Sequence, residues 1–453
     1  MTNIHLAAYI LSPTSHYIGS WRHPLSARNM LDRAFFEDIG RTLEEGLFDL
    51  AFLPDILAIP ESGGSSDDFI SRGSRGVINL DPTQILAVIA GVTRHLGLGA
   101  TLSSTFYPPY LLARILGSLD HLSGGRVAWN IVTTADDMSA RNFGQEAVSE
   151  HDSRYDRADH VLEAITRLWQ SWDGDALLLD KETGAFADST KVHRVDYDAG
   201  GISVRGPLQF PPTPQRHPVL FQAGASGRGR DFAARWGEAI FLIQSNKDDL
   251  RAIRNDIRAR AAAIGRDPDR IKFFPAVQIV VGETRAVAKA RQQALQDWTD
   301  PAVARALISQ YLRKDLTKLS SDTSLDHLLE EFAVKNGATS SIKVILAALT
   351  EHGQTVEAVA QRYAETHLAP QFVGTPADIA DSLQDFVEAG AADGFVITPT
   401  HLPGTFDDIA RGVIPELQAR GVYRTSYEGT TLRDNLGVGL PDHTLWERSH
   451  GKL

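Results

Sequence analysis

The segment His121–Gly144, HLSGGRVAWNIVTTADDMSARNFG, reads as a turn, a buried strand and then a polar loop. Its Ser-Gly-Gly start has turn chemistry, and Arg126–Val132 is a short β-rich run suited to a strand buried on both faces. The strand ends among hydrogen-bonding side chains, those of Asn130, Thr133 and Thr134. In a parallel barrel the C-terminal strand ends carry the chemistry. The segment therefore predicts a barrel strand whose end forms part of a ligand-binding floor.

Strand-like runs alternate with helical patterns along the whole chain, which is typical of repeated βα units. We expect strands near Ile4–Leu11, Leu47–Leu53, Leu96–Ser103, Val127–Val132, Val219–Gln222, Ala239–Leu242, Lys272–Val281 and Gly394–Thr398. Amphipathic helices are expected between them, for example over Ala34–Gly46, Pro109–His121, Arg154–Trp172 and Gly229–Gly237. This pattern predicts an α/β fold, a (β/α)8 TIM barrel, with residues 1–453 forming a single domain.

Two long segments are additional to the strands and helices of a minimal barrel. Asp173–Pro218 is rich in turns and prolines, whereas Glu283–Phe372 is mostly helical and includes AVAKARQQALQDW and SSIKVILAALTEHG. We expect both to be insertions over the catalytic face, where lids and oligomer contacts are often found. The polar tail Arg424–Leu453 is expected to wrap a neighbouring subunit.

Composition narrows the class of protein. With 43% hydrophobic and 23% charged residues the chain is an ordinary globular protein, and its net charge of −12 argues against nucleic acid or an anionic membrane as partner. The absence of cysteine excludes disulfides and thiolate metal sites. The N-terminus does not look like a secretory signal, and no apolar run has the length of a membrane span. We therefore expect a cytoplasmic protein.

The segment QAGASGRG, residues 222–229, joins the end of a strand to the start of a helix. Free N–H groups at a helix start bind anions, barrels often bind phosphate in late βα loops, and Ser226 adds a hydroxyl donor. The alternative is a tight turn in which Ser226 only caps the helix, and the local sequence leaves both open. No GxGxxG dinucleotide fingerprint follows the first strand.

Polar residues also mark the ends of the other early strands. Asp55 follows the second predicted strand, Thr101 lies within the third, and Asn130 and Thr134 close the fourth. Small polar groups beside apolar ones suit a pocket for a small organic ligand. Asp55 could instead cap a helix or a turn, and Thr101 could be an ordinary β-branched strand residue. Asn130 is harder to assign to a structural role, because a buried amide needs partners.

The first βα loop contains two histidines and other candidates for the reacting centre. His16 and His23 could move a proton or bond a reacting oxygen, although a surface role is the common one for loop histidines. Trp21 and Phe106 are candidate apolar walls of a substrate pocket, and Arg22 is a candidate cation. We expect no metal site, because HExxH and His-carboxylate spacings are missing, and no GxSxG elbow indicates a serine hydrolase.

Several segments together resemble one group of flavin-dependent monooxygenases within the bacterial-luciferase-like superfamily. The group includes the nitrilotriacetate, pristinamycin IIA-forming and dibenzothiophene-sulfone monooxygenases, and the similarity is greatest to the last type. Besides the opening segment, the motifs are FDLAFLPDILA (Phe48–Ala58), LGLGATLSSTFYPPYLLAR (Leu96–Arg114), EHDSRYDRAD (Glu150–Asp159), VRGPLQ (Val204–Gln209), FQAGASGRGRDFA (Phe221–Ala233) and GAADGFVITP (Gly390–Pro399). The resemblance covers nearly the whole chain and implies the same barrel fold.

The resemblance also implies how the cofactor FMN is bound. Ser226 and Gly227 would hold the phosphate, together with Tyr155, and His151 would bond the ribityl chain. The implied flavin contacts are Asp55, Thr101, Asn130 and Thr134. The resemblance favours a catalytic role for His16, with His23 as the next candidate.

The activity implied by the resemblance is a two-component monooxygenase reaction. A separate NAD(P)H:flavin reductase would supply FMNH2, and O2 would be the co-substrate, one oxygen entering a small organic molecule and the other leaving as water. A sulfone or other sulfur heterocycle is the favoured substrate, with a nitrilotriacetate-like aminopolycarboxylate as the alternative. A deazaflavin F420-dependent oxidoreductase and a non-catalytic flavin-binding protein are the alternative classes. We expect a homodimer or homotetramer.

Overall fold

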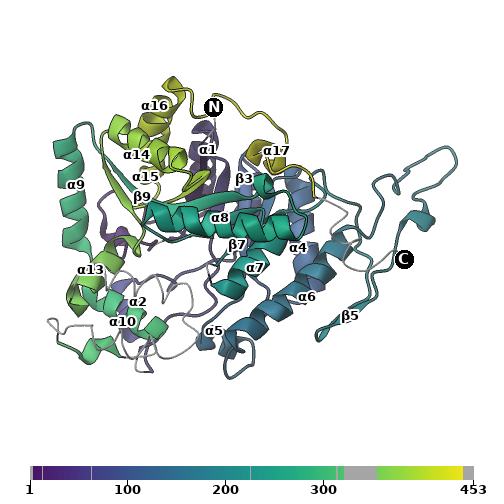
Figure 1. Cartoon of the computed structure of the whole chain (residues 1–453), viewed down its shortest axis with the longest axis horizontal. Helices are drawn as coiled ribbons and strands as arrows, with labels where there is room; N and C mark the ends of the chain where they lie inside the picture. The colour runs from purple at the N-terminus through teal and green to yellow at the C-terminus, as the bar shows by residue number, and fades with distance from the viewer. Residues whose placement is uncertain are drawn as a thin grey trace.

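The computed structural model describes residues 4–12, 14–62, 64–224, 226–312, 315–320 and 355–441. Eight parallel strands form a closed barrel within them (Figure 1). In barrel order they are β1 (His5–Tyr9), β2 (Leu50–Leu53), β3 (Gly97–Ser103), β4 (Val127–Val132), β7 (Val219–Ala223), β8 (Ala239–Leu242), β9 (Lys272–Val281) and β11 (Gly394–Thr398). Pairing of β11 with β1 completes the ring, so the predicted (β/α)8 barrel is confirmed.

Helices surround the barrel (Figure 1). Those that follow or precede barrel strands are α1 (Arg33–Glu45), α3 (Pro82–Ala90), α4 (Pro109–Ser123), α6 (His151–Trp169), α7 (Gly227–Trp236), α8 (Lys247–Ala263) and α14 (Pro376–Glu388). Shorter ones in loops and near the C-terminus are α2 (Asp67–Arg72), α5 (Asp137–Asn142), α15 (Gly404–Asp408), α16 (Ile414–Ala419) and α17 (Leu432–Leu436). Each of the four helices given as examples from the sequence overlaps an observed one, α1, α4, α6 and α7.

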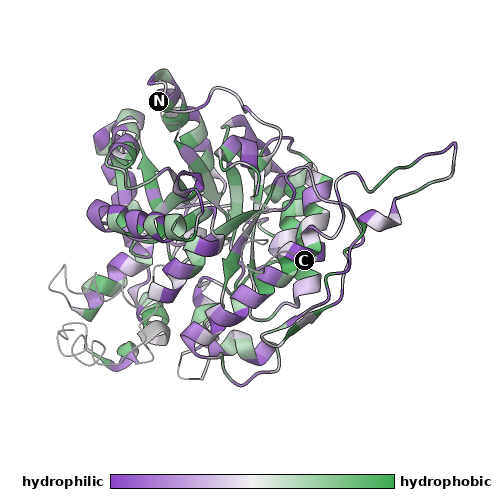
Figure 2. Cartoon of the chain, turned by 45° about the vertical axis from the view of Figure 1, so that its right-hand side comes forward, coloured by the Kyte–Doolittle hydropathy of each residue, from purple (hydrophilic) through white to green (hydrophobic). Residues whose placement is uncertain are grey.

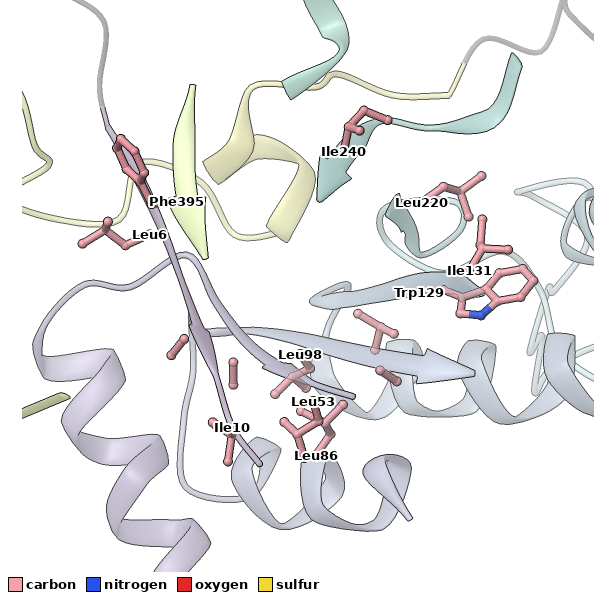
Figure 3. Close-up of a cluster of buried hydrophobic side chains, with 14 of the residues drawn as sticks. Leu6, Ile10, Leu53, Leu86, Leu98, Trp129, Ile131, Leu220, Ile240 and Phe395 are labelled. Carbon is pink, nitrogen blue, oxygen red and sulfur yellow. The ribbon is translucent and has the colours of Figure 1, made fainter. Parts of the chain in front are cut away.

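Strand alternation divides the core into two layers. Along β1, Leu6 and Ala8 pack outward against the helices, whereas Ala7 and Tyr9 point into the barrel. Figure 3 shows the outer layer, in which Trp129 of β4 lies among aliphatic side chains of neighbouring strands. Hydrophobic residues accordingly concentrate in the strands and polar ones on the outer helix faces (Figure 2).

The barrel interior is packed with small and aromatic side chains. The ring centroid of Phe221 lies 5.9 Å from that of Phe52 and 5.6 Å from that of Phe274. Gly99 makes room for this layer, because a Cβ at that position would lie 3.2 Å from Cδ2 of Phe52. The interior is therefore a core rather than a channel, and a ligand has access only at the strand ends.

The first insertion does not lie on the catalytic face. It follows α6, which runs from the C-terminal ends of the strands back to the opposite end of the barrel. At that opposite end, Gln215 Nε2 of the insertion donates to Asp120 Oδ1 (2.6 Å) and to the backbone oxygen of Val127 (2.8 Å), the first residue of β4. The expected placement over the catalytic face is therefore wrong for this segment. The insertion includes the hairpin of β5 (Tyr197–Ala199) and β6 (Ile202–Val204), and part of it projects from the body as an arm (Figure 1).

The second insertion lies at the C-terminal end of β9. Its described elements are α9 (Arg285–Trp298), α10 (Pro301–Leu312), α13 (Val356–Thr366) and β10 (Gln371–Gly374). β10 pairs in parallel with the last residues of β9, from Gln371 beside Gln278 to Gly374 beside Val281, and so extends the sheet beyond the barrel rim. The predicted helix SSIKVILAALTEHG lies outside the described residues.

The C-terminal segment closes the other end of its own barrel. Leu432 and Leu436 of α17 pack into the barrel interior, and Arg433 binds Glu238 with Nη1–Oε1 and Nη2–Oε2 distances of 2.6 and 2.8 Å. Arg424 pairs with buried Asp49. The expectation that this tail wraps a neighbouring subunit is therefore wrong for residues 424–441, and residues 442–453 lie outside the described part. Among the described helices, none has the length and apolar character of a membrane span.

Candidate active site

A pair of polar side chains replaces the apolar core at the ends of β3 and β4. Thr101 and Asn130 are paired in the register of β3 and β4. By strand alternation both side chains point into the barrel, as that of Ala128 does. Asn130 Nδ2 donates to Thr101 Oγ1 at 3.0 Å, while Asn130 Oδ1 is buried and has no hydrogen-bond partner among the described residues. A buried amide oxygen without a partner is costly, so this atom marks a place for a donor from a ligand.

Further polar side chains lie in the loops that follow the barrel strands. Thr134 Oγ1 donates to Ser103 Oγ at 2.7 Å. Asp55, which follows β2, accepts hydrogen bonds from Asn79 Nδ2 (3.2 Å) and the Tyr107 hydroxyl (3.5 Å). Burial, together with the charge of Asp81, raises the pKa of Asp55 to about 6. The structure therefore places all four predicted ring contacts at the C-terminal ends of β2, β3 and β4.

The predicted phosphate segment forms a helix start with open space beside it. Ser226 is the N-cap of α7, and its Oγ accepts from Gly229 N at 3.0 Å. A Cβ at Gly227 would meet no atom within 4 Å. The capping interpretation is thus correct, and it is compatible with an anion site because backbone N–H groups in the first turn of a helix have no partner within the helix.

The start of α6 meets the start of α7 at this point. His151 Nε2 lies 3.3 Å from Ser226 Oγ. The Tyr155 hydroxyl, one turn further along α6, lies 3.0 Å from where a Cβ of Gly229 would be, so glycine is needed there for the close approach. Arg228 does not point at this space as a free cation, because its guanidinium binds Asp156 and Asp159. The four residues predicted for phosphate and ribityl binding, Ser226, Gly227, His151 and Tyr155, are therefore brought together.

A second cluster lies over the barrel mouth. The ring of His16 lies 4.4 Å from that of Tyr9, at the end of β1, and 4.9 Å from that of His367. The Tyr363 hydroxyl lies 3.3 Å from His367 Nε2, and Arg75 Nη2 donates to the Tyr9 hydroxyl at 2.8 Å. We call Tyr9, His16, Arg75, Tyr363 and His367 the mouth cluster. Sequence reasoning found only His16 of this group.

Both histidines of the mouth cluster are held neutral. Burial, followed by the charges of Arg75 and His367, lowers the pKa of His16 well below its usual value. Burial and Arg75 do the same for His367. His16 is 2% exposed, and its Nδ1 has no hydrogen-bond partner among the described residues. A neutral imidazole donates from one ring nitrogen and accepts at the other, and its tautomer decides which nitrogen does which.

The other predicted residues of the first loop lie apart from His16. His23 stacks on His401 at 3.8 Å, and its Nδ1 accepts from Leu25 N. Trp21 is 46% exposed and donates to the backbone oxygen of Arg72, while Arg22 donates to that of Trp298. These bonds tie the first loop to α2 and to the second insertion. The structure does not bring Trp21, Arg22 or His23 together with the mouth cluster.

Phe106 lies on the Asp55 side of the mouth. Its ring stacks on that of Phe143 with centroids 4.6 Å apart and an angle of 2° between the planes. Asn142, next to Phe143, donates to the backbone oxygen of Leu57, so α5 is attached to the loop after β2. This stacked pair forms an apolar wall beside the polar strand ends. Within the ranges described above, no three His, Asp or Glu side chains converge as metal ligands would.

Comparison with known proteins identifies the family. The model of the family described as luciferase-like monooxygenase matches residues 20–393. The chain belongs to the luciferase-like monooxygenase family. This monooxygenase is 45% identical over 441 residues to the dibenzothiophene-sulfone monooxygenase of Rhodococcus erythropolis (strain XP), with 97% of each chain covered.

Two further relatives extend the comparison. Nitrilotriacetate monooxygenase component A of Aminobacter aminovorans is 36% identical to this monooxygenase, with 95% of each chain covered. The crystal structure of riboflavin lyase (RcaE) with modified FMN and substrate riboflavin superposes with a TM-score of 0.87 at 33% identity, covering 96% of each chain. The monooxygenase barrel is therefore shared over nearly its whole length with a protein that was crystallised with a modified FMN.

Proposed function

We propose that this protein is the oxygenase component of a two-component, FMNH2-dependent system that oxidises a sulfone or related sulfur heterocycle. The observation that carries the proposal is the pairing of two sites at one end of the barrel. The unpartnered amide oxygen of Asn130 lies at one, and the open helix start at Ser226 and Gly227 forms the other. A flavin ring would fit the first and its phosphate the second.

The residues present suit FMN. Asn130 Oδ1 would accept from a ring N–H, with Thr101, Thr134 and Asp55 beside it, and Gly227 N and Ser226 would hold the phosphate. Because the Tyr155 hydroxyl lies beside Gly229 and His151 beside Ser226, Tyr155 would also reach the phosphate and His151 would bond the ribityl chain. When bound, reduced FMN supplies the electrons that activate O2, whereas the protein supplies binding, orientation and exclusion of water. The riboflavin lyase structure with modified FMN supports this choice of cofactor.

We assign His16 the role of holding a proton near the reacting oxygen. It is buried over Tyr9 at the barrel mouth and has an unpartnered Nδ1. His23 is the less favoured candidate because its Nδ1 is already bonded to Leu25 N. Phe106 would bound the substrate space on the Asp55 side, whereas Trp21 and Arg22 would act only through the first loop.

The need for a reductase is supported by the name of a relative and by the sequence. The nitrilotriacetate enzyme is called component A, which indicates a further component in that system. No GxGxxG fingerprint follows the first strand of this chain. We therefore propose that a separate NAD(P)H:flavin reductase delivers FMNH2 in the cytoplasm.

The mouth favours an aromatic sulfone over a polycarboxylate. The rings of Tyr9 and Phe241 lie 6.1 and 5.8 Å from that of Phe52 and form an apolar floor. An aminopolycarboxylate would need several cations converging on its carboxylates. The 45% identity to a dibenzothiophene-sulfone monooxygenase supports the same choice.

The test uses the purified full chain with chemically reduced FMN, O2 and dibenzothiophene sulfone, and measures product. We expect oxygenated product under these conditions, no NADH oxidation by the chain alone, and NADH-driven turnover once a flavin reductase is added. Rapid NADH oxidation without a reductase would contradict the two-component assignment. Product from nitrilotriacetate but not from the sulfone would favour the alternative substrate.

A further inference from the structure

Arg75 extends from the loop after α2 into the mouth cluster. It follows α2 in the sequence SRGSRG, and Thr14 Oγ1 donates to the backbone oxygen of Gly73, which joins this loop to the first one. Arg75 Nη2 donates to the Tyr9 hydroxyl at 2.8 Å, at the end of β1. The guanidinium is thus held at the rim of the barrel interior, beside the apolar floor formed by Tyr9, Phe52 and Phe241.

The side chains around Arg75 are arranged for an acceptor oxygen. The guanidinium is close enough to His16 and His367 for its charge to affect both, and the two rings meet edge to face at 4.9 Å. Because both imidazoles stay neutral, the positive charge at this point belongs to Arg75. His16 is 2% exposed, and its Nδ1 lacks a partner among the described residues. One ligand oxygen that accepts from Nδ1–H of His16 would satisfy this nitrogen and sit in the field of the guanidinium.

We propose that Arg75 is the specificity-determining residue that recognises a sulfonyl oxygen of the substrate, with His16 as the second donor to that oxygen. This inference rests on the proposed function and names the residue that recognises the substrate class of that function. Tyr9 is a positioning residue, since its hydroxyl accepts from Arg75.

A neutral, strongly polarised oxygen fits better than a carboxylate. Among the five residues of the mouth cluster only Arg75 carries a charge, because both imidazoles are neutral, and the floor beside them is aromatic. A sulfone presents strong acceptor oxygens on an otherwise apolar body and carries no net charge to desolvate. A polycarboxylate would leave further charges facing the apolar floor, which is costly.

The test compares binding of two ligands of the same tricyclic shape to the full chain in the presence of FMN. Dibenzothiophene sulfone carries sulfonyl oxygens, whereas fluorene carries none. Dissociation constants are measured by tryptophan fluorescence for the wild type, Arg75→Gln, Arg75→Met, Arg75→Lys and the control Arg72→Gln. Arg72 is a matched control because it lies three residues earlier in the chain, is exposed and pairs with Asp300. Thermal melting and FMN affinity report whether each variant keeps its fold and its cofactor site.

We expect Arg75→Gln to weaken sulfone binding by roughly 10- to 100-fold, as for the loss of a hydrogen bond to a charged donor. Fluorene binding should change by less than about twofold, because apolar contacts do not depend on this charge. Arg75→Lys should recover part of the sulfone affinity, and Arg72→Gln should change neither ligand.

Three outcomes overturn the inference. Equal sulfone affinity in wild type and a folded Arg75→Gln would remove Arg75 from recognition, and should Arg75→Gln not fold, equal affinity in Arg75→Met, which also lacks the charge, would do the same. Parallel losses for sulfone and fluorene would give Arg75 a structural role. Absence of sulfone binding to the wild type would reject the substrate class. The proposed function fails separately, if reduced FMN and O2 give no product from any substrate in a panel of sulfones, sulfides and polycarboxylates.

Discussion

Ser226 caps a helix, and we propose that the same hydroxyl group also binds the FMN phosphate. Its Oγ caps α7 by accepting from Gly229 N, and it lies 3.3 Å from His151 Nε2. Ser226→Ala should weaken FMN binding by about 1.5–3 kcal/mol, the usual value for one hydrogen bond to a charged acceptor. Ser226→Asp keeps a capping oxygen but should weaken FMN binding more, through charge repulsion. Titration with FMN and riboflavin checks this, because the contrast between the variants should vanish for riboflavin. Equal effects on the two flavins would place Ser226 away from the phosphate.

His16 is predicted to affect how reduced flavin is used rather than how it is bound. It belongs to the mouth cluster, whereas the phosphate space lies beside α7. His16→Ala should leave FMN affinity largely intact and should raise H2O2 release at the expense of product. Product and H2O2 are measured with chemically reduced FMN, and His23→Ala is the matched control from the same loop. Unchanged yields in His16→Ala would return His16 to a structural role.

Asp55 should make the fold less stable as the pH rises. Its folded pKa of about 6 lies above the usual carboxyl value, because burial and Asp81 disfavour the charge. The folded state therefore holds the proton more tightly, and stability falls as the pH rises from about 4 through 6. Asp55→Asn should remove this loss and stabilise the protein above pH 6 by on the order of 2 kcal/mol. Denaturant unfolding at pH 5 and pH 8 measures the difference, and a variant without a pH-dependent gain would contradict the assignment.

At the scale of elements, the projecting arm of the first insertion exposes large apolar side chains. Leu179 and Phe186 are 57% and 65% exposed on it, although Leu179 N donates to the backbone oxygen of Phe186. A two-stranded hairpin of this kind has little stability by itself. We propose that the arm contacts another copy of the chain in a homodimer or homotetramer.

Replacement of the two exposed arm residues tests that proposal. Leu179→Ser combined with Phe186→Ser should lower the mass measured by light scattering and leave the melting of the barrel nearly unchanged. Leu122→Ser is a suitable control, since Leu122 is 84% exposed on α4. An unchanged mass in the double variant would place the subunit contact elsewhere.

At the scale of the whole molecule, the end of the chain is tied to the barrel through a buried ion pair. Arg433 is 1% exposed, and Glu238 also accepts from Leu220 N at 2.9 Å. Although burial opposes the charge, Arg433 and His217 hold the pKa of Glu238 below its usual value. The stabilisation is therefore present above the unfolded pKa and is lost as the pH falls through the folded one.

Arg433→Met should destabilise the protein at pH 7 by about 3–5 kcal/mol, because it leaves a buried carboxylate unpaired. The double variant Arg433→Met, Glu238→Leu should be closer to the wild type, since it removes both charges. Urea unfolding at pH 7 and pH 4 checks this, and the penalty of the single variant should shrink at the lower pH. Equal losses in the single and double variants would show that packing of α17, not the ion pair, is what matters.

Local patterns sufficed for much of the fold and for naming polar residues that the structure brings together. Strands and helices follow from hydrophobic periodicity, which each segment carries by itself. Asn130 was singled out because an amide in an apolar strand needs partners, and Ser226 because a strand-to-helix turn has a recognisable sequence. That Asn130 and Thr101 form a pair followed only from the register of β3 and β4.

Tertiary structure decided the features that depend on distant parts of the chain. Arg75 and His367 join His16 over Tyr9 although they come from different loops, and neither stands in a motif that reveals it. The first insertion was misplaced although the predicted order already contained the answer: it connects a helix to the next strand, and in a βα barrel such connections lie opposite the catalytic face. The tail was misjudged because the arginines that make it look polar are buried against Glu238 and Asp49. Composition and periodicity report what a segment can bury, whereas its actual partners are set by how the closed barrel brings remote segments together.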